Sequence, residues 1–383
     1  MTGIRELHDW VRAHRADLLS DLAGYVGIET PSDDKESLRK GLSWVDTWLR
    51  ERIGEPESGR DVDGGPHGDI KVYDYPGAGE QPVLVLCHYD TVWPLGTLAH
   101  WPFTVDGDRA TGPGIFDMKS GLVHVVWALR AIDAHDLPRP ALRIVLNGDE
   151  ELGSPASRPV IEEAARDTRA TLVFEASASG AVKTSRKGVG LFQVHATGVE
   201  SHAGLDPTKG ASAIDELARA ILALHALTDL AAGTTVNVGV ISGGTRQNVI
   251  AGSAHGEIDV RVASAAEAAR VDAGLAALAA HDPRATVKIE GGWNRPVMER
   301  SDAIAQLYEL ARDRAAELGV DLRETSVGGA SDGNFVAALG HAVLDGFGAV
   351  GDGAHARHEH ISVDGMLERT ALAADVLYRL GQS

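Results

Sequence analysis

The sequence lacks several features that mark particular classes of protein. It has a single cysteine, Cys87, which excludes an internal disulfide framework and is typical of a reducing cytoplasm. No window reaches the roughly 18 unbroken apolar residues of a membrane helix, and the first residues lack the apolar core of a signal peptide. Positive charge is scarce, because 36 Lys and Arg stand against 55 Asp and Glu. The net charge of -19 argues against a nucleic-acid partner, and we predict a cytoplasmic protein with no membrane contact.

What is present is the composition of an ordinary globular protein, with 44% hydrophobic and 24% charged residues. The 383 residues are enough for two domains. The acidic surplus has two explanations, namely surface solubility and carboxylates that bind metal. Only a few of the 55 acidic residues could be ligands, so the net charge does not choose between these explanations.

Strand and helix patterns alternate over the first half of the chain. The first residues have the spacing of an amphipathic helix, with one apolar face formed by Ile4, Leu7, Val11, Leu18 and Leu22. Further helices are predicted at 35–52, 117–135 and 157–166, and strands at 69–75, 82–90, 141–147 and 170–176. This alternation predicts an α/β domain with a mostly parallel sheet.

The pattern changes near residue 188. Strands are predicted at 190–198, 234–244, 249–262 and 285–291, with helices at 211–229 and 264–280. The order β-α-β-β-α-β is that of a ferredoxin-like α/β sandwich. Because the earlier alternation then resumes, we predict an inserted domain at 188–293 within a first domain made of 1–187 and 294–383.

Two early motifs carry residues that can bind metal. In "CHYDTV", His88 can ligate a metal through one ring nitrogen, and Asp90 can fix its tautomer through the other. In "GPGIFDMKSG", Asp117 follows a loop of glycines and proline, and its two oxygens can bridge two cations. The alternatives are a structural histidine with a turn aspartate, and an aspartate that caps a helix.

Adjacent glutamates follow an apolar strand in "LRIVLNGDEELGS". In metal-assisted hydrolysis one carboxylate can ligate while the other takes a proton from water, which would give Glu150 and Glu151 different roles. The alternative is a solvated turn. The sequence assigns no role to the preceding Asp149.

Two later motifs complete the set. Glu175 follows the apolar stretch "TLVF", and the loop "GDGAHARHEHISV" contains His355, His358 and His360. The residues alone do not say which of these histidines ligates, and a solvated polar loop is the alternative for His358 and His360. Histidines and carboxylates after strands suit zinc, cobalt or manganese. We expect each of the five motifs to follow a strand. Since the carboxyl ends of parallel strands meet at one edge of a sheet, we expect a metal site there.

The ordered motifs "HYDTV", "GPGIFDMKSG", "GDEELGS", "FEAS", "ESHAG" and "GAHARHEHI" resemble those of a known family. It is the dinuclear-zinc metallopeptidase family of glutamate carboxypeptidase (carboxypeptidase G), acetylornithine deacetylase and succinyl-diaminopimelate desuccinylase, and the glutamate carboxypeptidase branch is nearest. The resemblance implies a zinc-exopeptidase-like catalytic domain with a mostly parallel sheet. It also implies that the insertion is a lid or dimerisation domain through which a homodimer forms.

The resemblance implies a ligand set for two Zn²⁺ ions, with Co²⁺ or Mn²⁺ as alternatives. Asp117 would bridge the two ions. His88 and Glu175 would complete the site of one ion, and Glu151 and His355 the site of the other.

Catalytic roles follow from the same resemblance. Glu150 would be the general base and Asp90 would orient the ligand His88. His202 in "ESHAG" would stabilise the oxyanion, often from the partner subunit; a histidine that caps a turn is the alternative. The family also has a cis peptide after the bridging aspartate, here expected between Asp117 and Met118.

Several residues match substrate-binding positions of the glutamate carboxypeptidase branch. They are Lys183, Asn248, Arg261 and Arg295, together with the glycine-rich loop "GGASDGN" at 328–334. An arginine fork suits a free carboxylate. The alternative is that these cations form salt bridges within the inserted domain.

The predicted function is metal-dependent hydrolysis of an amide bond that releases a C-terminal amino acid, with glutamate a candidate, from a small peptide or N-acyl substrate. One alternative is an N-acyl amino acid deacylase or dipeptidase on the same scaffold. A non-catalytic metal-binding homologue is the other, and the intact set of ligands and base speaks against it. The acyl group is not readable, because the residues that line its pocket are not recognisable in sequence.

Overall fold

A computed structural model describes residues 3–382, so the predictions for residues 1, 2 and 383 lie outside the described residues. The chain forms two compact units. Unit 1 contains the described residues up to Ser185, with Arg300–Val327 and those from Ser331 onward. Unit 2 contains Arg186–Glu299 and Gly328–Ala330. The predicted insertion at 188–293 falls inside unit 2, and its assignment as a lid stays a prediction.

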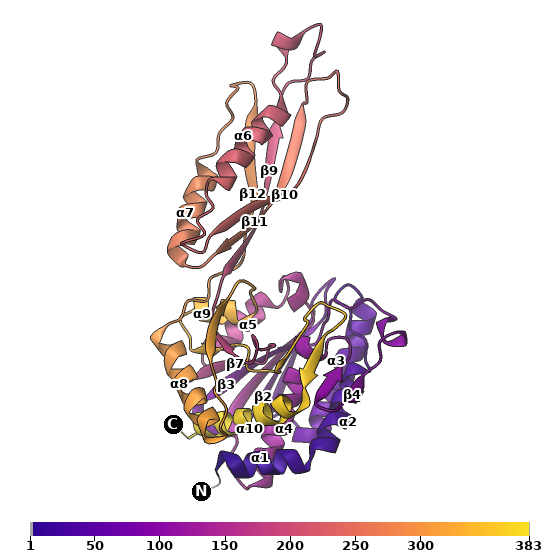
Figure 1. The fold of residues 1–383 in the computed structure, drawn as a ribbon, viewed down its shortest axis with the longest axis vertical. Helices are drawn as coiled ribbons and strands as arrows, with labels where there is room; N and C mark the ends of the chain where they lie inside the picture. The colour runs from indigo at the N-terminus through magenta and orange to yellow at the C-terminus, as the bar shows by residue number, and fades with distance from the viewer. Residues whose placement is uncertain (1–2, 383) are drawn as a thin grey trace. The chain divides into compact units, whose positions relative to one another are not determined.

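Unit 1 is built on a six-stranded mixed sheet (Figure 1). The strands, in their order across the sheet, are β1 (Ser58–Val62), β2 (Ile70–Tyr75), β6 (Pro140–Asn147), β3 (Ala78–His88), β7 (Ala170–Val173) and β14 (Val343–Leu344). The β6, β3, β7 and β14 strands pair in parallel, whereas β1 and β2 join antiparallel at one side. The α/β fold with a mostly parallel sheet is therefore confirmed.

Helices cover the sheet of unit 1. They are α1 (Ile4–Ala13), α2 (Arg15–Val26), α3 (Lys35–Ile53), α4 (Ser120–Ala134), α5 (Arg158–Ala165), α8 (Asp302–Glu317), α9 (Gly333–Ala338) and α10 (Val363–Leu380). Figure 1 shows α4 and α10 on one side of the strands and α5 and α9 on the other. The apolar runs of β3 and β6 lie between these layers and are buried at Val83–Cys87 and Ile144–Leu146, which is why they form the centre of the sheet.

The first helical stretch differs from its prediction. It divides into α1 and α2 at His14, whose Nδ1 hydrogen bonds to the Trp10 carbonyl oxygen at 2.8 Å. A side chain that bonds the backbone in this way competes with the helix ladder. The five apolar residues predicted to share a face are nevertheless all fully buried.

Short strands outside the two larger sheets were not predicted. They are β4 (Thr104–Asp106), β5 (Arg109–Thr111), β15 (Gly351–Asp352) and β16 (His360–Ser362) in one antiparallel sheet, and β8 (Val182–Arg186) with β13 (Glu324–Val327) in another. Most of them are too short to show an alternating pattern. The β4–β5–β16–β15 sheet matters for the site, because its loops carry His355 and the segment that precedes Asp117.

Unit 2 is a four-stranded antiparallel sheet with two helices. Its elements, in chain order, are β9 (Gly188–Thr197), α6 (Ala213–His225), β10 (Thr235–Gly243), β11 (Ser253–Val262), α7 (Ala265–Ala276) and β12 (Thr286–Arg295). The predicted β-α-β-β-α-β order is confirmed. Alternate residues of β9 and β11 are buried in a core with α6 and α7, which leaves the other face of the sheet open. In the part of the chain that the structure describes, no helix has the length and apolar character needed to cross a membrane.

Candidate metal centre

Three of the predicted ligands follow neighbouring parallel strands. His88 is the last residue of β3, Glu151 lies in the short helix η3 (Glu150–Leu152) after β6, and Glu175 follows β7 by two residues. Because β6, β3 and β7 are adjacent in the sheet, their carboxyl ends bring the three side chains to one edge.

The expectation that all five ligands follow parallel strands is wrong for Asp117 and His355. Asp117 lies in a wide helical turn, η2 (Ile115–Lys119), that leads into α4. His355 lies in the loop between β15 and β16, with a φ of 60°. A positive φ costs a non-glycine residue about 1–3 kcal/mol and is often found at functional sites. Both loops reach the sheet edge from the small β4–β5–β16–β15 sheet.

His88 is at the centre of one group of contacts. Its Nε2 lies 3.3 Å from Oδ1 of Asp117 and 3.4 Å from Oε1 of Glu175. Its Nδ1 faces Asp90, with 3.0 Å to the backbone carbonyl oxygen and 3.3 Å to Oδ1. Asp90 itself accepts hydrogen bonds from the Ser32 hydroxyl at 2.9 Å and the Glu151 amide at 3.2 Å. Asp90 is therefore held in place and can fix the orientation of the His88 ring through Nδ1.

His355 is at the centre of a second group. Its Nε2 lies 3.2 Å from Oδ2 of Asp117 and 3.0 Å from Oε2 of Glu151. The two carboxylate oxygens of Asp117 are therefore divided between the two histidines, one to each. This is the arrangement expected of a carboxylate placed between two cations.

The two adjacent glutamates, Glu150 and Glu151, belong to different sets of neighbouring ligand atoms. Ligating atoms of His88, Asp117 and Glu151 lie within 4.8 Å of one another, and so do those of His88, Glu150 and Glu175. Oε1 of Glu151 is buried and makes no hydrogen bond within the described residues. A buried carboxylate oxygen without a donor is costly, so this atom fits a cation ligand.

The electrostatics also fit a cation site. Burial raises the pKa of Glu151 to about 7, and contacts with Asp117 and Glu151 raise the pKa of His355 to about 10. Burial opposes charge on His88, but its hydrogen bonds to Asp117, Asp90 and Glu175 outweigh burial and raise its pKa well above the ordinary value. Protonated imidazoles thus offset an excess of carboxylate charge, and metal ions would displace those protons.

The expected cis peptide between Asp117 and Met118 is present. The backbone just before it is fixed by Glu359, a residue that the sequence analysis missed. Glu359 is fully buried, and its carboxylate accepts hydrogen bonds from the amides of Phe116 and Asp117 at 2.8 and 3.1 Å. It also accepts from the amide of Gly114 at 3.1 Å and from Trp93 Nε1 at 2.8 Å. Its charge and its position four residues after His355 were the available signals.

Three residues without an assigned role now have local partners. Asp149 is fully buried, and its Oδ2 accepts from the amides of Ala156 and Ser157 at 2.7 and 3.1 Å, just before α5. It therefore fixes the loop after η3. His360 Nδ1 hydrogen bonds to the carbonyl oxygen of His358 at 2.9 Å, and neither histidine belongs to the ligand groups found among the described residues.

The candidate residues of unit 2 form two separate groups. His202 and Asn248 lie on paired segments, since Asn248 O accepts from the amide of Ala203 at 3.0 Å. Nδ1 of His202 accepts from two backbone amides at 3.1 Å each, so the neutral ring carries its proton on Nε2.

The arginine group lies at the opposite end of the unit 2 sheet. Arg261 on β11 and Arg295 on β12 both pair with Val189 near the start of β9, whereas the His202 segment follows the end of β9. The length of β9 separates the groups by roughly 25 Å. Arg261 is held by Asp259 through a 2.9 Å ion pair, and Arg295 is buried.

The remaining substrate candidates belong to unit 1 or divide between the units. Lys183 lies on β8, where its amide donates to the Asp345 carbonyl oxygen at 2.7 Å, and it is in neither ligand group. In the loop 328–334, Gly328–Ala330 belong to unit 2 and the rest to unit 1. There Asp332 is buried and accepts from Nδ2 of Asn147 at 2.8 Å, so part of this loop is fixed by internal bonds.

Imidazoles and carboxylates converging at the strand ends of a mixed α/β sheet define a metal-dependent hydrolase. The chain belongs to Peptidase family M20/M25/M40, whose family model matches residues 84–379. It is 30% identical over 379 residues to carboxypeptidase G2 from Pseudomonas sp. (strain RS-16), an alignment that covers 95% of this chain and 89% of that protein.

Solved structures share the fold. The aminopeptidase PepT from Bacillus cereus superposes with a TM-score of 0.78 at 18% identity, covering 96% of this chain and 98% of that chain. The YXEP protein of Bacillus subtilis, described as a dinuclear metal binding peptidase from the M20 family, has a TM-score of 0.67 at 14% identity. That alignment covers 97% of this chain and 99% of the other.

Proposed function

We propose that the protein cleaves an amide bond to release a C-terminal amino acid from a small peptide or N-acyl substrate, with glutamate as the first residue to test. The observation that carries the proposal is the convergence of His88, Asp117, Glu151, Glu175 and His355 on one sheet edge beside Glu150. The 30% identity to a carboxypeptidase over nearly the whole chain supports the carboxypeptidase direction.

The site is proposed to hold two metal ions, with zinc first and cobalt or manganese as alternatives. His88 and Glu175 would hold one ion, Glu151 and His355 the other, and Asp117 both. The division of the Asp117 oxygens between the two histidines supports this assignment. When bound, the metals would supply Lewis acidity that polarises a carbonyl group and lowers the pKa of water.

Glu150 is proposed as the general base. Its carboxylate would take a proton from the attacking water and return it to the nitrogen of the leaving amine. Its place beside His88 and Glu175 supports this role, because it is close to the reacting centre while Glu151 faces His355. Asp90 would keep the His88 ring in the ligating orientation through Nδ1.

His202 is proposed to donate a hydrogen bond from Nε2 to the oxygen that becomes negatively charged during attack. The two backbone amides on Nδ1 support this role, because they place the proton on the opposite nitrogen. Arg261, Arg295, Asn248 and Lys183 are proposed to bind the substrate carboxylate and backbone. An arginine fork matches a carboxylate, although Arg261 must then exchange or share its Asp259 partner.

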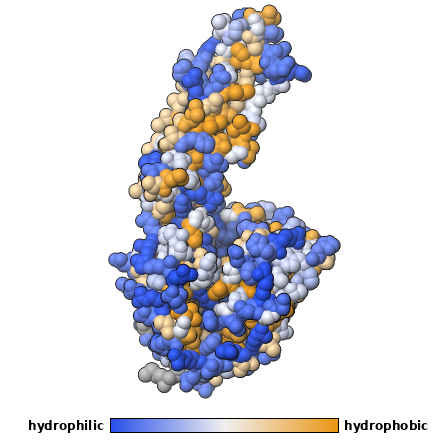
Figure 2. Space-filling view, viewed as in Figure 1, coloured by the Kyte–Doolittle hydropathy of each residue, from blue (hydrophilic) through white to orange (hydrophobic). Residues whose placement is uncertain are grey.

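A homodimer through unit 2 is part of the proposal. His202 with Asn248 and the two arginines are too far apart in one chain to act on one small substrate, so a second copy would supply one group. Strand β10 is at the edge of its sheet, and Val240, Ile241 and Leu222 are 53%, 60% and 74% exposed. Figure 2 shows hydrophobic side chains gathered on one face of this unit. Such an edge is suited to pairing with another chain.

A substrate panel on metal-loaded protein tests the function. Folate-type and other N-acyl glutamates are compared with acetylornithine, succinyl-diaminopimelate and dipeptides. Preference for the glutamates supports the proposal. Preference for the others makes the protein a deacylase or dipeptidase, and bound metal without hydrolysis of any of them makes it a non-catalytic homologue. A cytoplasmic location remains a prediction, to be tested by fractionation.

A further inference from the structure

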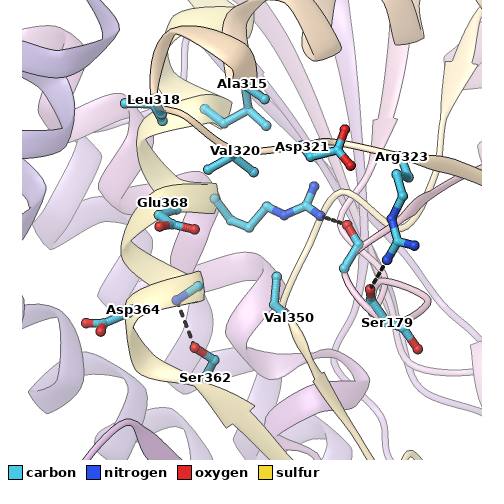
Figure 3. Close-up of a pocket in the computed structure, with 14 residues that line it drawn as sticks. Ser179, Ala315, Leu318, Val320, Asp321, Arg323, Val350, Ser362, Asp364 and Glu368 are labelled. Atoms are coloured by element: carbon cyan, nitrogen blue, oxygen red, sulfur yellow. Dashed lines mark hydrogen bonds between the residues drawn. The ribbon is translucent and has the colours of Figure 1, made fainter.

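A cavity of about 340 Å³ lies in unit 1, apart from the proposed metal ligands. It is bounded by the end of α8, the first turns of α10 and the turn around Gly180 (Figure 3). Pockets for small molecules measure roughly 300–1,000 Å³. The cavity is therefore of the size that holds a small ligand.

One buried guanidinium on this cavity has an incomplete set of partners. Arg369 of α10 is 4% exposed, and its Nη2 donates to the carbonyl oxygen of Gly180. Its Nη1 is buried without a hydrogen-bond partner among the described residues, and the charge of the adjacent Glu368 stabilises it only in part. Burial lowers the pKa of Arg369 to about 10, so the group stays charged at neutral pH. An unpaired buried charge is costly, and an anionic acceptor from outside would remove that cost.

Charges of both signs line the same cavity without pairing. Arg323 donates from Nη2 to the carbonyl oxygen of Ser179 at 3.5 Å. Figure 3 shows Asp364 and Glu368 on the helix and Asp321 with Arg323 on the facing segment. Among the described residues none of these three carboxylates forms an ion pair. Asp321, Arg323 and Asp364 are exposed to solvent and Glu368 is half-buried. A simple anion would be repelled by the carboxylates, whereas the ammonium group of a ligand with both charges would offset that repulsion.

Apolar side chains form the rest of the wall. They are Ala315, Leu318, Val320, Val350 and Leu372. We propose that this cavity binds a free α-amino acid with an apolar side chain, such as leucine. Its carboxylate would face Arg369 and Arg323, its ammonium group Glu368, and its side chain the apolar wall. This binding site does not depend on the proposed peptidase reaction.

Two segments that line the cavity are close in sequence to proposed metal ligands. Val350 directly precedes β15, which leads to His355, and Ser179 follows Glu175 by four residues. An amino acid in the cavity would contact both segments.

Calorimetry on the full-length protein tests the proposal, using metal-loaded and chelator-treated samples. The probes are L-leucine, L-leucinamide, which lacks the carboxylate, and 4-methylpentanoate, which lacks the ammonium group. We expect saturable leucine binding in both samples, and binding of the other two weaker by at least about tenfold, because each loses a charged hydrogen-bond partner.

Two variants locate the binding. Arg369→Lys should weaken leucine binding by at least about tenfold, because an ammonium group cannot replace the guanidinium fork. Val320→Trp fills the cavity without removing a charge, and it keeps the test valid if Arg369→Lys does not fold. The matched control is Arg312→Gln, an exposed arginine of α8 outside the cavity, which should keep the wild-type affinity.

Several outcomes would overturn the proposal. Absence of saturable binding would mean that no amino acid provides the missing hydrogen-bond partner of Arg369. Equal binding of leucinamide or 4-methylpentanoate would remove the requirement for both charges. Unchanged leucine affinity in both cavity variants would mean that the amino acid binds outside this cavity. Loss of leucine binding after chelation would mean that it binds at the metal centre.

Discussion

Unit 1 and unit 2 differ in where they place charged side chains. Unit 1 buries many of them, including Asp90, Asp149, Glu175, Glu359 and Arg369, and most have a defined partner. In unit 2 the buried charged residues are Arg186, Glu216 and Arg295, among those described. A buried charge needs a partner, so the side chains of the metal centre are fixed by their surroundings. In unit 2, His202 is exposed and held by two backbone amides, and Arg261 is half-buried and held by Asp259.

The largest effect is expected in unit 1, from Glu150→Gln. Loss of the base should lower turnover by about 10²–10⁴-fold, with metal content unchanged by elemental analysis. The control is Glu162→Gln, a glutamate of α5 paired with Arg158, which should keep normal turnover. Near-normal turnover of the variant with metal present would rule out Glu150 as the general base. Loss of metal from the variant would indicate that Glu150 is a metal ligand.

A matched pair of buried glutamates tests the difference between the units directly. Glu359 binds amides next to Asp117, while Glu216 of α6 binds the amides of His281 and Asp282 at 2.6 and 2.9 Å. Glu359→Gln should weaken metal binding by about 10–100-fold, because a residue that positions a ligand is lost. Glu216→Gln should leave metal affinity unchanged. Metal titration against a competing chelator measures both, and equal effects would remove the distinction between the units.

The third prediction concerns stability against pH in unit 1. His124 of α4 is fully buried, its Nδ1 pairs with the Thr370 hydroxyl at 2.9 Å, and burial lowers its pKa to about 3. Below pH 6.5 the unfolded chain binds a proton that the folded chain does not, so folding loses stability as the pH falls. Relative to His124→Leu, the wild type should lose about 2 kcal/mol of unfolding free energy between pH 7.5 and 5.0.

Urea unfolding at the two pH values measures this difference. An identical pH dependence in wild type and variant would show that His124 takes up its proton in the folded state. The substitution itself should be tolerated, because leucine is similar in size and has no polar atom to satisfy.

The smallest effect is expected in unit 2. Arg261→Gln should raise KM by about tenfold for substrates with a free carboxylate, because one charged hydrogen bond is lost. Metal content and kcat should not change. Arg270→Gln, on α7 and paired with Glu267, is the matched control. An unchanged KM would assign Arg261 to its ion pair with Asp259 alone.

Much of unit 1 could be predicted because its apolar strands end in polar side chains. The runs before His88 and Glu150 are buried, and strand order at the sheet edge then brings the following residues together. The charge of Glu359 and its place near His355 did not reveal its role, since its partners are backbone amides more than 200 residues away in sequence. The β15 and β16 strands, which place His355, are too short to leave a pattern.

In unit 2 the sequence predicts elements better than it predicts the arrangement of functional groups. Apolar and polar residues alternate along β9 and β11 because alternate side chains are buried. This pattern allowed the order of strands and helices to be predicted. The separation of His202 from Arg261 depends on which end of β9 each segment reaches. That depends on strand pairing, which local patterns do not encode.

The position of His355 and Glu359 after unit 2 has a consequence for synthesis on the ribosome. His88 is translated before unit 2, but the loop that carries His355 and Glu359 follows the whole of unit 2. At about 5–20 residues per second, the nascent chain exposes an unfinished cluster of histidine and carboxylates for roughly a quarter of a minute to a minute. During that interval the Asp117 turn lacks its Glu359 acceptor, so the proposed metal site can be completed only after Glu359 has been translated.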